Sequence, residues 1–175
     1  GPPLGDVVDQ RKIFGFEDIP GDGQTTTLAA GFLLSSIWQK MQNRGGALNA
    51  VNYTLVVDEA HRVKGLKALE NMLRMGRSKG LAVILATQSA ADLPSYVHDN
   101  AQSRICFRIL NEDAARAAAQ SLGSNDLAGR IRNLADGEAI VTLGGSEPRK
   151  LRMVQCRYDW ERWKQSKDLT APRDD

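Results

Sequence analysis

A pair of carboxylates follows a strand-like segment of this chain. The apolar residues 55–57 lead directly into Asp58 and Glu59, and consecutive apolar residues are typical of a strand that is buried on both faces in an α/β protein. In such sheets, ligands bind beyond the carboxyl ends of the strands. We therefore expect both acids to face a ligand. Asp58 is suited to order Mg²⁺, and Glu59 to orient an attacking water or accept its proton, as in nucleoside-triphosphate hydrolysis.

A second strand-like segment ends in an amide. Residues 81–87 are apolar up to Thr87 and are followed by Gln88. A glutamine side chain both donates and accepts hydrogen bonds, so it can sense a γ-phosphate or its attacking water. We expect Asp58, Glu59 and Gln88 to meet at one edge of a sheet. The alternative is a solvated acid pair and ordinary loop polarity.

The remaining segments alternate between strand-like and helical patterns. Strands are predicted at 11–16, 53–58, 81–87 and 103–110, helices at 28–42, 63–76, 112–122 and 125–134, and an antiparallel strand pair over 137–145 and 149–158. This order predicts an α/β fold with a mostly parallel sheet and helices on both faces. Helix 28–42 is apolar on nearly all sides, so we expect it to pack deeply. Thr25 to Thr27 and Asn111 are the expected N-caps of two of these helices.

Length and composition indicate one globular domain. The chain has 175 residues, 42% of them hydrophobic and 25% charged. No apolar run approaches the roughly 20 residues of a membrane span, and no signal peptide is apparent, so we expect a soluble, cytoplasmic protein. Cys106 and Cys156 form no CxxC pair, and two histidines provide no metal constellation. Gly1-Pro2 resembles a tag-cleavage scar.

Four segments in order carry a family resemblance: "TLVVDEAHRV", "RMGRSKGLAVILATQSAADLP", "NAQSRICFRI" and "LADGEAIVTL". The order resembles the second half of the HerA/FtsK superfamily of hexameric P-loop motors. The resemblance implies that residues 3–158 are the C-terminal part of a RecA-like ATPase domain, with 159–175 as a peripheral tail. It also implies ATP and Mg²⁺ as cofactors, a homo-hexamer around DNA, and nucleotide bound between subunits.

The same resemblance implies a role for individual residues. Asp58 is the Walker B residue for magnesium, Glu59 the catalytic glutamate, and Gln88 the polar sensor, with Thr87 beside the nucleotide. Arg77 resembles the arginine finger that reaches a neighbouring subunit's nucleotide, and Arg74 is the second candidate.

One part of such a motor is absent from the sequence. No G-x-x-x-x-G-K-[ST] phosphate loop occurs, and the nearest glycine-rich string, "GDGQTTT", lacks the lysine. We therefore expect this chain alone to be inactive, with the loop upstream of Leu4 in a longer parent or lost by decay. In the family, the strand before that loop lies between the equivalents of 81–87 and 103–109. These two strands must pair directly, leave a gap, or recruit another chain.

A basic stripe lies between the two chemical motifs. Residues 62–79 contain six Lys or Arg and one acid, Glu70, a net charge of +5 in a chain of +2. Such a stripe favours sequence-independent contact with the DNA backbone, and a solvated face is the alternative. The candidate contacts are Lys64, Lys67, Arg74 and Lys79.

Several functions remain open at this point. The leading hypothesis is an ATP-driven DNA translocase that works with a nuclease or another system partner in defence, restriction, chromosome segregation, end resection or conjugation. A non-catalytic RecA-like assembly or DNA-binding module is the second. A DEAH-box helicase is the third, but its Gln-Arg-x-Gly-Arg pattern is missing, and His61 is then a local helix-start residue.

Overall fold

The computed structural model describes residues 13–16, 23–43 and 50–153. Their order is α2 (Gly23–Asn43), β1 (Tyr53–Val57), η1 (Ala60–Val63), α3 (Lys67–Met75), η2 (Gly76–Lys79), β2 (Leu81–Leu85), η3 (Ala90–Asp92), α4 (Ser95–Asn100), β3 (Arg104–Cys106), α5 (Glu112–Ser121), α6 (Leu127–Arg132), β4 (Glu138–Thr142) and β5 (Arg149–Arg152). The fold is α/β, as predicted.

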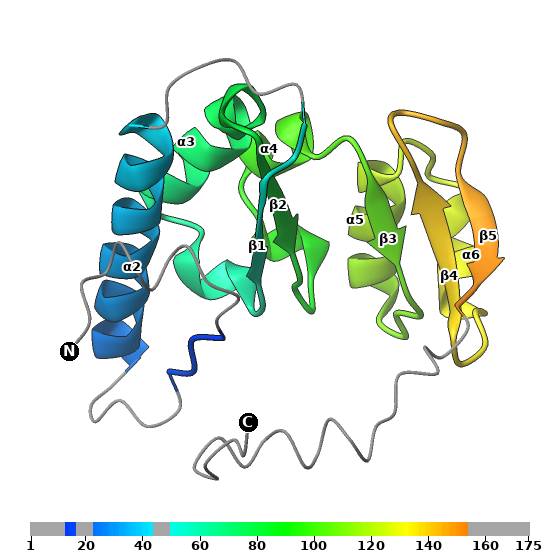
Figure 1. Ribbon diagram of the computed structural model, residues 1–175. Coiled ribbons are helices and arrows are strands. Elements are labelled where there is room, and N and C mark those ends of the chain that lie inside the picture. Colours follow the sequence, from blue (N-terminus) through cyan, green and yellow to red (C-terminus); the bar gives the residue numbers. More distant parts are fainter. Residues whose placement is uncertain (1–12, 17–22, 44–49, 154–175) are drawn as a thin grey trace, which may run out of the picture.

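The described strands form two separate sheets. β1 and β2 are parallel, with Tyr53 opposite Leu81 and Val57 opposite Leu85. β3, β4 and β5 form an antiparallel sheet in that order. This confirms the predicted antiparallel pair near the C-terminus over Glu138–Thr142 and Arg149–Arg152, while residues 154–158 of the predicted pair lie outside the described residues. The pairing of β3 with β4 was not predicted. β2 and β3 do not pair with each other, although β1, β2 and β3 run in the same direction (Figure 1).

Each sheet packs one face against helices. α2 and α3 cover β1 and β2, and Met41, Leu69 and Met72 are almost fully buried between them. α5 and α6 cover the second sheet, where Ile131 and Ile140 are fully buried. Ala115, Ala118 and Ala119 on the inner face of α5 are buried in the same cluster. The opposite sheet faces expose Val56, Ile84 and Ile105, which are more than half accessible to solvent.

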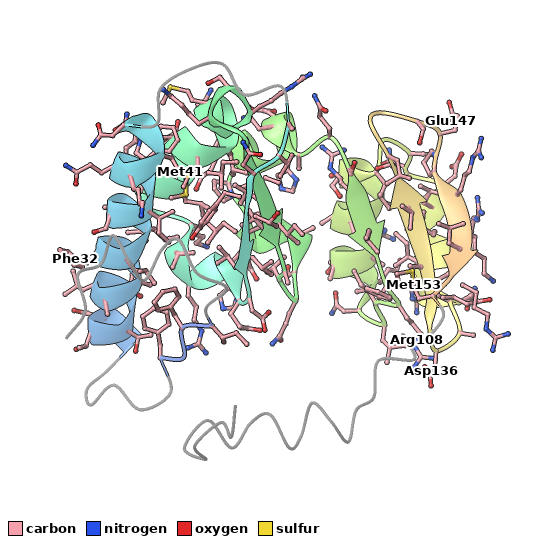
Figure 2. All side chains as sticks on the ribbon, viewed as in Figure 1. Phe32, Met41, Arg108, Asp136, Glu147 and Met153 are labelled. Atoms are coloured by element: carbon pink, nitrogen blue, oxygen red, sulfur yellow. The ribbon has the colours of Figure 1, made fainter. Side chains whose placement is uncertain are left out.

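Helix α2 differs from the expectation in two ways. Its side chains at Leu28 and Phe32 are 74% and 72% exposed, so it packs by one face and not all round (Figure 2). The helix already includes Gly23, which places Thr25 to Thr27 within the helix and not at its N-cap. The Thr27 hydroxyl donates to the Gly23 carbonyl over 2.8 Å instead of capping an amide.

Other element boundaries also move. The helix predicted over 63–76 is divided: η1 ends at Val63, and α3 begins at Lys67. Gly65 lies in the break, consistent with its low helix propensity. The strand predicted over 103–110 is only Arg104–Cys106. Residues 13–16 are not a strand, and 11–12 lie outside the described residues.

Two predicted helix ends are confirmed. The Asn111 side chain accepts a hydrogen bond from the Ala114 amide over 2.9 Å and caps α5. Gly123 follows α5 with φ of +89°, the left-handed conformation that ends a helix at low cost in glycine. Within the described part of the chain, no helix has the length and apolar character to cross a membrane.

Candidate functional site

Backbone hydrogen bonds tie the ends of β1 and β2 together beyond the strands. The Ala86 amide donates to Val57 O, and the Ala60 amide donates to Ala86 O, both over 2.9 Å. Ala86 thus bonds to Val57 and Ala60 but not to Asp58 or Glu59, which lie between them. Both acids are therefore held in a short loop at the carboxyl end of β1. Backbone pairing therefore fixes where the two acids lie.

Glu59 has an unusual backbone conformation. Its φ of 51° and ψ of 45° place it in the left-handed region, and among the described residues it is the one non-glycine residue with positive φ. Asp58 Oδ1 accepts a hydrogen bond from the Glu59 amide over 2.9 Å. A non-glycine residue in this conformation is strained, and such strain clusters at functional sites. The turn allows both acids to lie at one edge, although adjacent residues on a strand point to opposite faces.

The structure brings Glu59 and Gln88 into direct contact. Gln88 Nε2 donates a hydrogen bond to Glu59 Oε1 over 3.0 Å. His61 Nε2 lies 3.6 Å from Glu59 Oε2, so both carboxylate oxygens face a nitrogen. About a third of each of the Glu59 and His61 side chains is exposed. The acid is therefore held in place but still reachable from solvent.

His61 is a neighbour of Glu59 that the pattern of residues did not indicate. Its place two residues after Glu59 became meaningful only once the left-handed turn directed the chain back toward the acid. Thr87 is half-buried beside the site, and its hydroxyl donates to Ser89 O over 3.3 Å. That bond shapes the loop that presents Gln88.

The two arginine candidates lie away from the acid pair. Arg77 is in η2, which precedes β2, whereas Asp58 follows β1. Because β1 and β2 are parallel, Arg77 lies at the opposite edge of the sheet. It is exposed there, so an Arg77 contact with nucleotide would have to be made to another subunit. Arg74 lies in the last turn of α3, on the same side as Arg77.

The basic stripe is partly neutralised within the chain. Glu70 pairs with Lys67 Nζ at 2.7 Å and with Arg74 Nε at 2.9 Å. The hydrogen bond from Lys67, with that from Arg74, lowers the pKa of Glu70. Lys79 Nζ donates to Gln42 O over 3.2 Å. Of the four predicted DNA contacts, Lys64 and Lys79 have no acidic partner among the described residues, and Lys64 is the exposed one of these two.

One family profile matches this chain. Its description is "TraM recognition site of TraD and TraG", and it matches residues 52–139, half of the chain. The chain belongs to this family. The match runs from just before β1 into β4, so it includes the Asp58, Glu59 and Gln88 edge. The TraG/TraD family assignment confirms the resemblance to HerA/FtsK-type P-loop ATPases.

Solved structures of low sequence identity share the fold. The genome packaging NTPase B204 of Sulfolobus turreted icosahedral virus 2, solved with ATP-gammaS, has 19% identity and a TM-score of 0.66, over 89% of this chain and 73% of B204. The plasmid coupling protein TrwB, solved with the GTP analogue GDPNP, has 17% identity and a TM-score of 0.62, over 75% of this chain and 38% of TrwB. VirB4 of Thermoanaerobacter pseudethanolicus has 18% identity and a TM-score of 0.67, over 85% and 42%.

These likenesses show that the chain has a RecA-like fold. The chain spans less than half the length of TrwB and of VirB4. No curated protein sequence matches it.

Proposed function

We propose that this chain is the C-terminal part of an ATP-driven DNA-translocating motor of the HerA/FtsK type that serves DNA transfer. The observation that supports it most is the hydrogen bond between Glu59 and Gln88 at the carboxyl ends of two parallel strands. Ligands of open α/β sheets bind at this edge. Two structural relatives, a genome packaging NTPase and a plasmid coupling protein, were solved with nucleotide analogues, and this supports a nucleotide as ligand and DNA as the substrate.

The residues at this edge suit hydrolysis of a nucleoside triphosphate. Glu59 can orient a water and accept its proton, because its carboxylate is partly exposed and a water can reach it. Gln88 donates to Glu59 Oε1 and His61 Nε2 lies 3.6 Å from Oε2, so that water would approach the partly exposed carboxylate beside His61. Gln88 has two amide hydrogens, so it can hold Glu59 and contact a phosphate oxygen together.

The donor set at Asp58 fits Mg²⁺. Asp58 is exposed, and one carboxylate oxygen accepts the Glu59 amide while the other remains for a metal or its waters. The described residues include no cluster of three or more His, Cys, Asp or Glu side chains that could hold a metal. Magnesium is commonly held by one or two carboxylates together with substrate phosphates, so Asp58 is sufficient. Bound Mg²⁺ would neutralise phosphate charge during hydrolysis.

The separation of the two sheets supports a phosphate-loop strand from another part of a longer polypeptide. Ala86 bonds to β1 through both its amide and its carbonyl, and strand alternation points Ile84 the same way. The backbone groups of Val83 and Leu85 therefore point away from β1, toward β3. No described strand pairs with this side of β2. An inserted strand would satisfy these groups and join the two sheets.

Assembly and partners follow from the same proposal. Arg77 acts as a finger on the nucleotide of the next subunit in a homo-hexamer, because it is exposed at the edge opposite its own Asp58. Lys64 contacts the DNA backbone, and Lys67, Arg74 and Lys79 do so only if they leave their present partners. The family description also supports a protein partner of the TraM kind.

Glu59→Gln tests the assignment in a polypeptide that includes the phosphate loop. Losing a positioned base lowers the rate by about 10²–10⁴-fold, so we expect ATP turnover to fall by this amount while binding of a fluorescent ATP analogue stays near the wild-type value. Glu147→Gln is the matched control, since Glu147 is an exposed acid in the turn that joins β4 to β5, away from the ends of β1 and β2 (Figure 2). Near-normal turnover in Glu59→Gln would refute the role of Glu59.

A second candidate is a non-catalytic assembly or DNA-binding module with the same fold. The same assay separates the two functions. A longer polypeptide that binds DNA but hydrolyses no ATP would support the module.

A further inference from the structure

A third strand end lies along the same edge as the acid pair. β3 ends at Cys106 and is followed by Phe107 and Arg108. β3 runs in the direction of β1 and β2, so Arg108 follows the end of β3 that corresponds to the carboxyl ends of β1 and β2 (Figures 1 and 2). The acid pair, Gln88 and His61 lie at the corresponding end of the neighbouring sheet. Arg108 adds a cation to this edge.

Arg108 is held by an acid from the loop before β4. Its Nη2 lies 2.7 Å from Asp136 Oδ1 (Figure 2). The Arg108 side chain is 43% exposed and that of Asp136 is 91% exposed. Ion pairs this close to water contribute little to stability, so another anion can replace Asp136 at small cost. The pair borders a shallow hollow of about 250 Å³, lined also by Phe107, Gly137 and Glu138.

The turn that presents Asp136 is well fixed. The Glu138 amide donates to Ala135 O over 3.0 Å, and the Ala135 amide donates to Glu138 Oε2 over 2.8 Å. Lys150 Nζ pairs with the same Glu138 oxygen at 2.7 Å. Gly137 completes the turn with φ of +77°, a conformation that favours glycine. Asp136 is therefore presented at a defined place and can hold the guanidinium in readiness.

We propose that Arg108 binds the phosphate groups of a nucleotide at this edge, and that Asp136 holds its guanidinium when no phosphate is bound. A guanidinium has five N–H donors in a planar fork that matches two oxygens of a phosphate, whereas the contact with Asp136 uses one nitrogen. This inference rests on the proposed nucleotide site, but it concerns a residue that the site at Glu59 does not include.

Titration of the full 175-residue chain with sodium tripolyphosphate tests the proposal. Binding is followed by the ¹⁵N signal of the Arg108 Nε–H group in chains that retain Arg108, and by isothermal titration calorimetry in the wild type and every variant. We expect this signal to shift and saturate. Arg108→Gln should weaken tripolyphosphate binding by about tenfold, the size of one lost charge-assisted contact. Asp136→Asn should tighten it severalfold, because the competing carboxylate is gone. Both residues are exposed, so the variants are expected to fold.

Arg116→Gln is the matched control. Arg116 is an exposed arginine of α5 that is also paired with an acid, Glu112, and its loss should leave binding unchanged. An Arg108 signal that tripolyphosphate does not move, or Arg108→Gln binding as tightly as the wild type, would overturn the site. Asp136→Asn binding no more tightly would overturn the role of Asp136. A thymidine oligonucleotide that shifts Arg108 at lower phosphate concentration than tripolyphosphate would overturn the nucleotide as its ligand. None of these results depends on Glu59 turnover, so the two proposals fail separately.

Discussion

At the scale of single residues, the backbone of Glu59 connects strain with function. The left-handed turn at Glu59 places its carboxylate against Gln88, a residue 29 positions further along the chain. A glycine would adopt this turn without a steric penalty. Glu59 therefore adopts a conformation that lowers the stability of the fold, and this conformation places its carboxylate against Gln88.

The backbone strain at Glu59 predicts opposite effects on stability for two glycine substitutions in the isolated chain. Glu59→Gly should raise the free energy of unfolding by up to about 1 kcal/mol, because glycine relieves the left-handed strain and an exposed hydrogen bond to Gln88 offsets little of that gain. Arg62→Gly, in the adjoining η1 turn, should lower it by about 0.5–1 kcal/mol. Urea denaturation measures both. A Glu59→Gly chain less stable than wild type would show that the turn is not strained.

At the scale of elements, α3 depends on one acid for both of its side-chain ion pairs. Glu70 accepts from Lys67 three residues before it and from Arg74 four residues after it, the spacings at which side chains meet on a helix. These bonds lower the pKa of Glu70 below its ordinary value of 4.5. The charged form is the one that the fold stabilises.

The sign of this shift predicts a loss of stability in acid. A carboxyl group with a lowered folded-state pKa stabilises the fold above its unfolded pKa, and this contribution is lost as pH falls through the folded value. The wild-type Tm should therefore exceed that of Glu70→Gln at pH 7, and the two should converge as pH falls below 4.5. Glu147→Gln, in the exposed β4–β5 hairpin, is the control and should follow the wild type. Parallel curves for wild type and Glu70→Gln down to pH 2 would contradict the role of Glu70.

The elements that the sequence predicted best were those with one dominant pattern. Residues 81–85 are apolar throughout and form β2, and Asn111 caps α5 as expected. The strand at 103–110 was overestimated because Ile109 and Leu110 continue the apolar run after pairing with β4 has stopped. The start of α3 was placed too early, since the η1 turn and Gly65 interrupt a continuous side-chain pattern.

Some contacts at the site could be predicted from the sequence, and others could not. The shared edge of Glu59 and Gln88 was predictable, because parallel strands end together. The approach of His61 to Glu59 depends on a backbone torsion, and the pairing of Arg108 with Asp136 joins two loops distant in sequence. Neither contact leaves a periodic pattern in the chain. Whether Asp58, Glu59, Gln88, Thr87 and Arg77 have the roles assigned to them stays a prediction.

At the scale of the whole molecule, the two sheets belong to one fold but share no described backbone ladder. The family profile spans both of them, and B204 matches 89% of the chain. The outward backbone groups of β2 and the exposed side chains of Val56 and Ile84 leave room for further structure. Parallel strands are usually covered on both faces, so we expect the longer polypeptide to cover this pair.

Amide hydrogen exchange tests the inserted strand. Val83 and Leu85 point away from β1, so their amides should exchange quickly in the isolated chain and slowly in the longer polypeptide. The Ile84 amide points toward β1 and should be protected in both, which makes it an internal control on the same strand. Equal exchange of Val83 and Leu85 in the two polypeptides would show that no strand inserts there.

The central claim is that the ends of β1 and β2 form the hydrolytic half of a nucleotide site. A crystal structure of the longer polypeptide with ATP-gammaS and Mg²⁺ tests it most directly. We expect the metal beside the Asp58 carboxylate, directly or through a bound water, with the γ-phosphate facing Glu59 and Gln88. A nucleotide bound at another edge of the sheet, with Asp58 and Glu59 in open solvent, would contradict the account.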